Sequence, residues 1–183
     1  MKRIFDIVSS FFGLMAFGWL ILLLTVAIAR DSPGPGLFAQ KRVGKGERVF
    51  VCYKLRTMAS DTVSAASHET PRSAVTRLGA VLRRWKLDEL PQLWNVLKGD
   101  MSFVGPRPCL PMQEMLIEER RKRGVFALRP GITGLAQVQG VDMSEPERLA
   151  TIDAAYAARR TIWLDLKLIL QTMTGRGRGD RVA

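Results

Sequence analysis

Residues 7–29, IVSSFFGLMAFGWLILLLTVAIA, form the longest uncharged stretch of this 183-residue sequence and decide how the rest is arranged. The stretch is bounded by Asp6 and Arg30. A helix rises about 1.5 Å per residue, so a helix of this length is long enough to cross the apolar core of a bilayer. We therefore predict a membrane anchor over residues 1–30.

A secretory signal peptide is the alternative interpretation, because Lys2 and Arg3 precede the apolar stretch and residues 27–29 resemble a cleavage site. The apolar cores of signal peptides are shorter, however, at about 7–15 residues. The two cysteines, Cys52 and Cys109, lie far apart and lack zinc-site spacing, which predicts reduced thiols in a cytosolic compartment. Both observations favour a retained anchor.

Basic residues flank the anchor on both sides: Lys2 and Arg3 precede it, and it is followed by Arg30, Lys41, Arg42 and Lys45. Positive residues favour the cytoplasmic side of a membrane, so both flanks are satisfied together only if the chain enters and leaves on the same side. We therefore predict a re-entrant helix with a bend at Gly13 or Gly18. A straight single span is the alternative.

The rest of the chain divides into a domain over residues 31–174 and a basic tail over residues 175–183, which we expect to be flexible because it is rich in glycine and arginine. Loose alternation of apolar residues predicts a short strand over residues 48–55. Residues 58–73 are polar and lack any apolar period, which predicts an exposed loop.

Three stretches carry apolar residues at the spacings of three and four that predict helices: residues 75–85, 90–97 and 162–173. The first has an apolar face ending in Trp85 and an arginine-rich polar face, a pattern typical of helices that lie in a membrane interface. Packing of that face on a protein core is the alternative. The predicted fold is mainly α with a minor β element: a membrane-embedded helix joined to a small domain with interfacial amphipathic helices.

The charge balance points to anionic partners. Lysine and arginine number 28 against 17 acidic residues, for a formal charge of +11. Such a chain suits nucleic acid, acidic lipid head groups or phosphorylated small molecules, and composition does not choose among the three. His68 is the only histidine, which disfavours a histidine-based triad or a histidine-rich metal site.

Two adjacent acids, Asp88 and Glu89, stand at the start of the 90–97 helix, ahead of Pro91, which a first helical turn tolerates. The positive end of the helix dipole keeps a carboxylate there ionised. Such an acid suits a nucleophile or a magnesium ligand. Ordinary helix capping is the alternative for the same two residues.

Basic residues accompany this acid pair, several of them in rigid loops. Arg107 lies between two prolines, and Arg129 opens a Pro/Gly turn. Within the five residues before the acids lie Arg83, Arg84 and Lys86. Guanidinium groups held near carboxylates fit a site for phosphates and a divalent metal ion. Surface charge runs are usually solvated, but they are seldom mounted in such loops.

The longest motif is KLDELPQLWNVLKGDMSFVGPRP, residues 86–108. It closely resembles the signature of the bacterial sugar transferases, the monotopic phosphoglycosyl transferases. Further stretches that resemble the family are KRIFD (2–6), FAQKR (38–42), YKLRTM (53–58), RPGITGLAQVQG (129–140) and LDLK (164–167). The resemblance covers nearly the whole chain and implies a minimal member with only the anchor and the catalytic domain.

The resemblance implies an enzyme that transfers a sugar 1-phosphate from a UDP-sugar to undecaprenyl phosphate, releases UMP, and begins bacterial glycan assembly such as exopolysaccharide biosynthesis. Its place would be the cytoplasmic face of the inner membrane. Asp88 would be the nucleophile, forming an aspartyl phosphosugar with ping-pong kinetics, and Glu89 would hold Mg²⁺. The groups that would bind phosphate or nucleotide are Lys54, Arg83, Arg107 and Arg129.

The implied partners are the UDP-sugar donor, undecaprenyl phosphate and membrane lipid, without nucleic acid. The sugar, the glycan pathway and homo-oligomer formation stay open. One departure concerns the anchor: the family usually carries a helix-breaking Ser-Pro pair where this chain has Gly18-Trp19. Two other functions compete, a membrane-tethered nucleic-acid binder that uses the basic domain and Arg-Gly tail, and an inactive scaffold for a glycan assembly complex.

Overall fold

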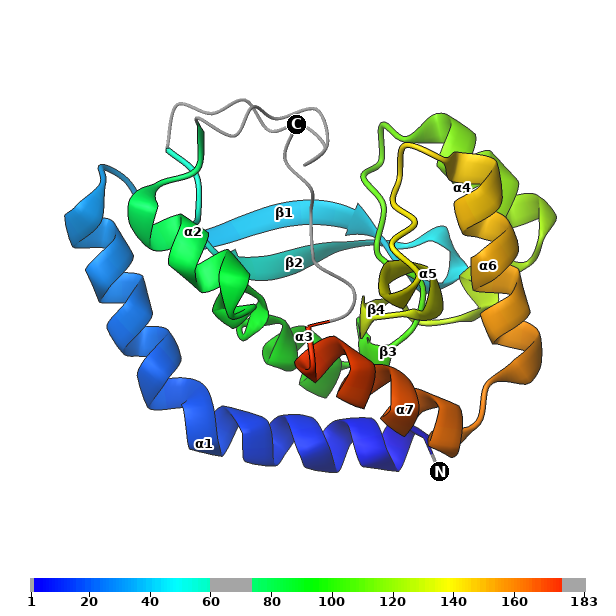
Figure 1. Cartoon of the computed structure of the whole chain (residues 1–183), viewed down its shortest axis with the longest axis horizontal. Coiled ribbons are helices and arrows are strands. Elements are labelled where there is room, and N and C mark those ends of the chain that lie inside the picture. Colours follow the sequence, from blue (N-terminus) through cyan, green and yellow to red (C-terminus); the bar gives the residue numbers. More distant parts are fainter. Residues whose placement is uncertain (1, 60–73, 176–183) are drawn as a thin grey trace.

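A computed structural model describes residues 2–59 and 74–175 of the chain (Figure 1). Helices surround two small sheets, which confirms the prediction of a mainly α fold with a minor β element. The elements, in order, are α1 (Lys2–Asp31), β1 (Leu37–Val43), η1 (Lys45–Glu47), β2 (Val49–Leu55), α2 (Arg77–Arg84), η4 (Leu87–Glu89), α3 (Gln92–Lys98), β3 (Ser102–Val104), α4 (Glu114–Lys122), η5 (Val125–Ala127), β4 (Gly131–Thr133), α5 (Leu135–Val138), α6 (Pro146–Arg159) and α7 (Ile162–Met173).

The larger sheet is an antiparallel hairpin of β1 and β2, in which Leu37 pairs with Leu55 and Val43 with Val49. The strand predicted over residues 48–55 is therefore confirmed as β2. Its partner β1 falls in the FAQKR stretch, which has too little alternation to indicate a strand by itself. The hairpin presents Lys54 near its end, on the side where η4 packs against β2.

The smaller sheet joins two parts of the chain that both carry motif residues. β3 and β4 run parallel, with Ser102 paired to Gly131 and Val104 to Thr133. The approach is so close that a Cβ atom at Gly131 would lie 2.1 Å from the backbone nitrogen of Gly105. Only glycine fits such a contact, so the Pro/Gly loops after β3 and before β4 are held side by side.

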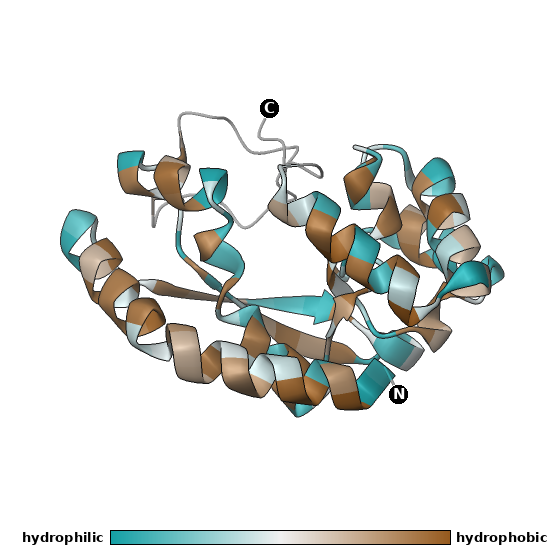
Figure 2. Cartoon of the chain, turned by 60° about the horizontal axis from the view of Figure 1, so that its bottom comes forward, coloured by the Kyte–Doolittle hydropathy of each residue, from teal (hydrophilic) through white to brown (hydrophobic). Residues whose placement is uncertain are grey.

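Helix α1 is long and apolar enough to cross a membrane, and its apolar side chains are largely exposed in the structure. Figure 1 shows that α1 bends partway along its length, and Figure 2 shows its mostly apolar ribbon running along one side of the molecule. Gly13 contacts α3, since a Cβ atom there would lie 3.1 Å from Leu93 Cδ1, whereas nothing lies within 4 Å of the same position on Gly18.

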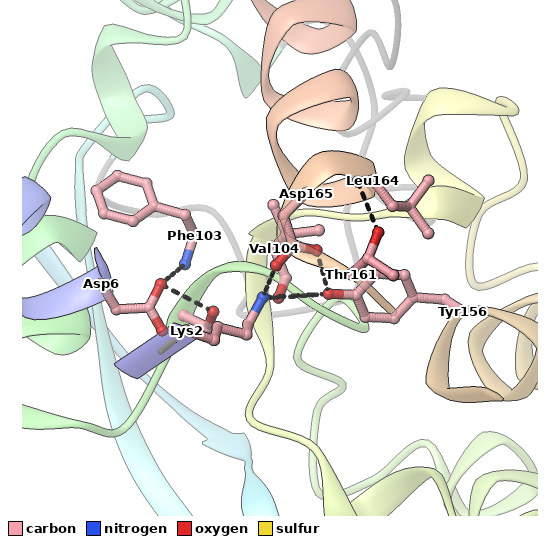
Figure 3. A network of polar contacts seen from close by, with 9 residues as sticks. Lys2, Asp6, Phe103, Val104, Tyr156, Thr161, Leu164 and Asp165 are labelled. Carbon is pink, nitrogen blue, oxygen red and sulfur yellow. Dashed lines mark hydrogen bonds and ion pairs between the residues drawn. The ribbon is translucent and has the colours of Figure 1, made fainter. Parts of the chain in front are cut away.

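The first turns of α1 are bound to the domain by polar contacts (Figure 3). Lys2 forms an ion pair with Asp165 of α7 and donates to the carbonyl of Val104 at 3.0 Å. Asp6 accepts hydrogen bonds from Ser102 Oγ at 3.1 Å and from Phe103 N at 3.2 Å. The KRIFD motif therefore ties the start of α1 to β3 and α7.

The far end of α1 is packed against the same domain. Its apolar side chains Ile21, Leu24 and Ile28 share a cluster with residues from β2, α2 and the turn that follows, namely Leu55, Leu78, Leu82 and Leu87. Arg56 reinforces this contact, donating from Nη2 to the Ser32 carbonyl at 2.7 Å. Both ends of α1 are thus fastened to one body of protein.

Helix α2 occupies the stretch predicted as helical over residues 75–85, beginning after Thr76, whose side chain accepts a hydrogen bond from Gly79 N. Leu78 and Leu82 pack against α1, as the core-packing alternative requires. Trp85, at the end of α2, is nevertheless 69% exposed. The apolar face of this helix is thus divided between protein contact and exposure.

The remaining expectations have mixed outcomes. Cys52 and Cys109 are both buried and free, in agreement with the prediction of reduced thiols. The helices predicted over residues 90–97 and 162–173 are confirmed as α3 and α7. His68, most of the predicted loop over residues 58–73 and the tail beyond Gly175 lie outside the described residues.

Candidate functional site

Asp88 and Glu89 lie in the tight turn η4, which connects α2 to α3. The turn starts at Lys86, which has a left-handed backbone with φ of 55°. Pro91 occupies the N-cap position of α3 and Lys86 that of η4, so neither acid stands at an N-cap. The acids therefore lie in the turn before α3, and neither occupies the N-cap position of α3.

Glu89 meets two cations that come from different elements. Lys54 Nζ, from β2, donates to Glu89 Oε1 at 3.3 Å, and Arg107 Nη1, from the loop after β3, lies 3.6 Å from the same oxygen. All three side chains are largely shielded, with 13–16% of their surface exposed. Shielding strengthens such charge interactions relative to water. Three of the predicted site residues are thus brought together.

A small cavity surrounds these groups. Asp88, the residue before Glu89, is buried but is not among the residues that line the cavity. The residues that line the cavity are Arg42, Cys52, Lys54, Glu89, Gln92, Arg107, Pro108 and Gly131. Three cationic side chains against one carboxylate make the lining suited to an anionic ligand. Burial raises the pKa of the Cys52 thiol, and the nearby positive charges of Lys54 and Arg42 partly oppose that rise.

Arg83 is held by the segment that follows β2. Its Nε donates to Thr57 Oγ1 at 2.9 Å. Its Nη1 is buried without a hydrogen-bond partner in the part of the chain that the structure describes. An unsatisfied buried guanidinium nitrogen is costly, so this donor is suited to an acceptor that the protein alone does not supply, such as a phosphate oxygen.

Arg129 has different surroundings from the other predicted cations. Its Nε donates to the carbonyl of Gly99 at 2.8 Å, at the end of α3, and Arg129 is not among the residues that line the cavity. The adjacent Gly131 does line it. The structure therefore gathers Lys54, Glu89 and Arg107 but directs Arg129 toward α3.

Five cavity residues were not predicted as site residues: Arg42, Cys52, Gln92, Pro108 and Gly131. Arg42 and Gln92 do lie within motifs, FAQKR and KLDELPQLW, which was the available signal. Asn95 supports the site from behind: it is fully buried, and its side chain bonds to Tyr53 N at 3.1 Å and to Val51 O at 2.6 Å. These bonds lock α3, which follows the acid pair, against β2.

Asp88 and Glu89 carry carboxylate oxygens, the type of ligand that Mg²⁺ prefers. Within residues 2–59 and 74–175 no group of three or more histidine, cysteine or acidic residues forms a ready-made metal cage. Mg²⁺ in phosphoryl-transfer sites is commonly held by one or two carboxylates together with substrate phosphates and water. Two neighbouring carboxylates, Asp88 and Glu89, supply that donor set.

Comparisons with known proteins point in the same direction. The sequence profile of the family described as Bacterial sugar transferase matches residues 1–177. The chain is 40% identical to the Undecaprenyl-phosphate glucose phosphotransferase of Komagataeibacter xylinus over 185 residues, covering 94% of this chain and 35% of that protein. It is 40% identical to the UDP-glucose:undecaprenyl-phosphate glucose-1-phosphate transferase of Caulobacter vibrioides, covering 94% of this chain and 68% of that one.

A third relative has nearly the same length as this chain. The Exopolysaccharide production protein PSS of Rhizobium leguminosarum bv. phaseoli is 39% identical, and the alignment covers 98% of both proteins. The chain thus spans about a third of the Komagataeibacter protein but almost all of the Rhizobium one. With a family match that runs from the anchor through α7, the chain belongs to the bacterial sugar transferase family.

Proposed function

We propose that this protein is a phosphoglycosyl transferase that moves a sugar 1-phosphate from a UDP-sugar to undecaprenyl phosphate and releases UMP. The observation that supports this most directly is the contact of Glu89 with Lys54 and Arg107 in a cationic cavity, with the buried Asp88 directly before Glu89 in the chain. Relatives named for transfer of glucose phosphate to undecaprenyl phosphate supply the substrate classes. The first membrane step of glycan assembly, such as exopolysaccharide biosynthesis, is the corresponding role.

In the first step a carboxylate oxygen of Asp88 attacks the sugar-bearing phosphorus of the donor. The bond from that phosphorus to the bridging oxygen breaks, and UMP leaves with the electron pair. Asp88 then carries the sugar phosphate as an acyl phosphate. In the second step a phosphate oxygen of undecaprenyl phosphate attacks the same phosphorus and displaces the Asp88 carboxylate, which gives a lipid diphosphate sugar. Covalent transfer of this kind has ping-pong kinetics.

The main obstacle is the repulsion between a carboxylate and a diphosphate. Lys54 and Arg107 offset that repulsion by binding the phosphate oxygens while negative charge passes from the attacking carboxylate to the oxygen of the leaving UMP. Arg83 Nη1, which has no hydrogen-bond partner among the described residues, is a further donor for the phosphate oxygens. Glu89, with the neighbouring Asp88, would hold Mg²⁺, and the ion would supply further neutralisation of the diphosphate charge.

The anchor is proposed to be re-entrant. Lys2 and Asp6 bind β3 and α7 at one end of α1, while Ile28 packs on β2 and α2 at the other. A straight membrane-spanning helix would place these two ends on opposite sides of the bilayer, where one small domain would be unable to hold both. The bend of α1 in Figure 1 agrees with entry and exit on one side. Its flanking positive charges favour the cytoplasmic face of the inner membrane.

The tryptophans support contact of the domain with the lipid surface. All four are exposed, between 49% and 78% of their surface: Trp19, Trp85, Trp94 and Trp163. Tryptophan is usually well buried in soluble proteins but is enriched where apolar lipid meets water. We propose that Trp85 and its neighbours lie at this boundary, where the site can receive a soluble donor and a lipid acceptor.

The test uses the full chain in nanodiscs with Mg²⁺, undecaprenyl phosphate and a panel of UDP-sugars. UMP release is expected with at least one sugar and is expected to be abolished by Asp88→Asn. Asp31→Asn, which removes an exposed acid at the end of α1, is the matched control and should leave release unchanged. A labelled donor should trap a phosphosugar on Asp88 when the acceptor is omitted. UMP release undiminished in Asp88→Asn would overturn the assignment.

A further inference from the structure

The loop that carries Arg107 has no regular secondary structure of its own. Prolines stand on both sides of Arg107 and lack an N–H group, so carbonyl groups provide much of the hydrogen bonding that can hold the loop. The carbonyls of Pro106, Arg107 and Pro108 each accept a hydrogen bond from a different part of the fold. Pro106 O accepts from Gly131 N at 2.9 Å. Arg107 O accepts from Arg120 Nη1 at 2.8 Å, and Pro108 O accepts from Arg42 Nη1 at 2.9 Å.

The donor to the central carbonyl, Arg120 of α4, is itself oriented by a buried acid. Its Nε and Nη2 donate to Asp153 Oδ2 on α6 at 3.0 Å and 2.7 Å. Each residue retains only 2% of its surface exposure. With Nε and Nη2 engaged by one carboxylate, the planar guanidinium has a set direction. That direction presents Nη1 to the Arg107 carbonyl.

Fold stability alone is a poor explanation for this pair. Removing two charges from water costs so much that apolar residues of similar volume often serve a protein core equally well or better. The next residue along α4, Arg121, illustrates the usual arrangement, because it pairs with Glu47 and Glu118 at the exposed surface. Beyond packing α4 on α6, Arg120 contacts the Arg107 carbonyl and the buried thiol of Cys109, two residues further along the same loop.

We propose that Arg120 and Asp153 are positioning residues that set the direction of Arg107 toward Glu89 and the donor diphosphate. This inference rests on the proposed function. The carbonyl that Arg120 holds is bonded to the Cα atom from which the Arg107 side chain begins. Rotation of that backbone would swing the guanidinium away from the cavity, where its Nη1 lies 3.6 Å from Glu89 Oε1. A displacement of about 1 Å in a phosphate-binding group can cost about a hundredfold in rate.

The decisive variant is Arg120→Met combined with Asp153→Leu, which replaces the buried pair by apolar side chains. If the pair only packed α4 on α6, this variant would keep both its stability and its activity. If the pair positions Arg107, the midpoint of thermal unfolding should change by less than about 4 °C, while kcat/KM for UMP release should fall about tenfold to a hundredfold. Affinity for UDP should fall in parallel. Arg121→Met is the control on the same helix and should leave both values unchanged.

Combining the double substitution with Arg107→Ala tests whether the lost activity comes from a misplaced Arg107 or from another cause. In a background of Arg107→Ala, adding the double substitution should change the Kd for UDP by less than about twofold, because the side chain being positioned is already gone. If the double substitution weakens UDP binding in the Arg107→Ala background as much as in the wild-type background, the proposal is overturned. If the double variant does not fold, Arg120→Lys decides by the same comparison, since an ammonium cannot serve Asp153 and the carbonyl together with the planar geometry of arginine.

The outcomes also distinguish this inference from the proposed function. Absence of UMP release by the wild-type chain would contradict the proposed function, while the coupling measured by UDP affinity would still test the positioning of Arg107. Normal UMP release and normal UDP affinity in the folded Arg120→Met/Asp153→Leu variant would contradict the positioning role and leave the proposed function intact.

Discussion

Lys2, in the first turn of α1, forms an ion pair with Asp165 of α7, 163 residues further along the chain (Figure 3). Tyr156 completes the contact: its hydroxyl donates to Asp165 Oδ1 at 2.6 Å and accepts from Lys2 Nζ at 3.1 Å. Burial raises the pKa of Tyr156, with the Asp165 carboxylate adding to the rise, so the hydroxyl stays protonated and able to donate. The start of α1 is thus joined to α7, the last helix of the domain.

Asp165→Asn should destabilise the protein while leaving the cavity residues in place. The side chain of Asp165 is 3% exposed and that of Lys2 is 32% exposed, so the substitution leaves a partly buried ammonium without its counter-charge. We expect a loss of about 1–3 kcal/mol, which corresponds to a drop of several degrees in the unfolding midpoint. Lys167→Gln, at an exposed position of the same helix, should change the midpoint little. The measurement is thermal unfolding in nanodiscs. Equal unfolding midpoints for Asp165→Asn and Lys167→Gln would contradict the predicted destabilisation.

Glu89→Gln should separate nucleotide binding from turnover. The substitution removes the negative charge that Lys54 and Arg107 face, so both cations become more available to a phosphate. In the presence of a metal chelator, UDP should therefore bind at least as tightly as to the wild-type protein, by calorimetry. With Mg²⁺, UMP release should fall by about a hundredfold or more. Glu118→Gln, at an exposed surface ion pair, is the control. Weaker UDP binding without metal would argue against the proposed phosphate contacts of Lys54 and Arg107.

The two ends of α1 should be reached from the same side of the membrane. A protease-cleavable tag placed before Met1 should be removed in inverted inner-membrane vesicles and protected in intact spheroplasts. A single cysteine at Asp31, in a background with Cys52 and Cys109 replaced by serine, should react with an impermeant maleimide under the same conditions. Opposite accessibility of the tag and the cysteine would establish a straight span instead.

The two native thiols should resist alkylation in the folded protein. Burial raises the pKa values of Cys52 and Cys109 above their ordinary value of 9.0, with nearby arginine charges opposing the rise. The folded state therefore keeps its thiol protons to higher pH than the unfolded state. Stability from this source is fully present below pH 9.0 and declines as the pH rises further. Mass spectrometry after iodoacetamide treatment at pH 8 should find both thiols intact, and modified only after unfolding.

Local patterns in the sequence were sufficient for some elements and insufficient for others. The apolar run of α1 and the alternation of β2 are signals of one segment each, and the structure confirms a helix over the first and a strand over the second. The helical stripe of residues 75–85 predicted a helix but not what its apolar face meets, because the answer depends on α1, about 50 residues earlier in the chain. The short parallel pair of β3 and β4 has no such signal, since three residues are too few to show a period.

The same distinction applies to the candidate site. The Asp88-Glu89 pair and the Pro-Arg107-Pro loop were recognisable from residue types and spacing, and the role of Asp88 as a nucleophile stays a prediction. Lys54 was predicted as a site residue only through the resemblance to the family. The structure brings Lys54 and Arg107 to Glu89 but turns Arg129 toward Gly99. No pattern within the sequence indicates which cation reaches which acid.

By itself the sequence determined that the chain has a membrane-compatible helix, a basic domain and an acid pair beside rigidly held arginines. These features follow from composition and from apolar residues that recur every two residues in a strand or every three to four residues in a helix. Both patterns are visible within a single segment of the chain. Tertiary structure alone decided that both ends of α1 meet one domain, and that the buried Arg120–Asp153 pair supports the Arg107 loop. Such contacts join residues far apart in the chain, and their free energy exists only once packing has excluded water from between them.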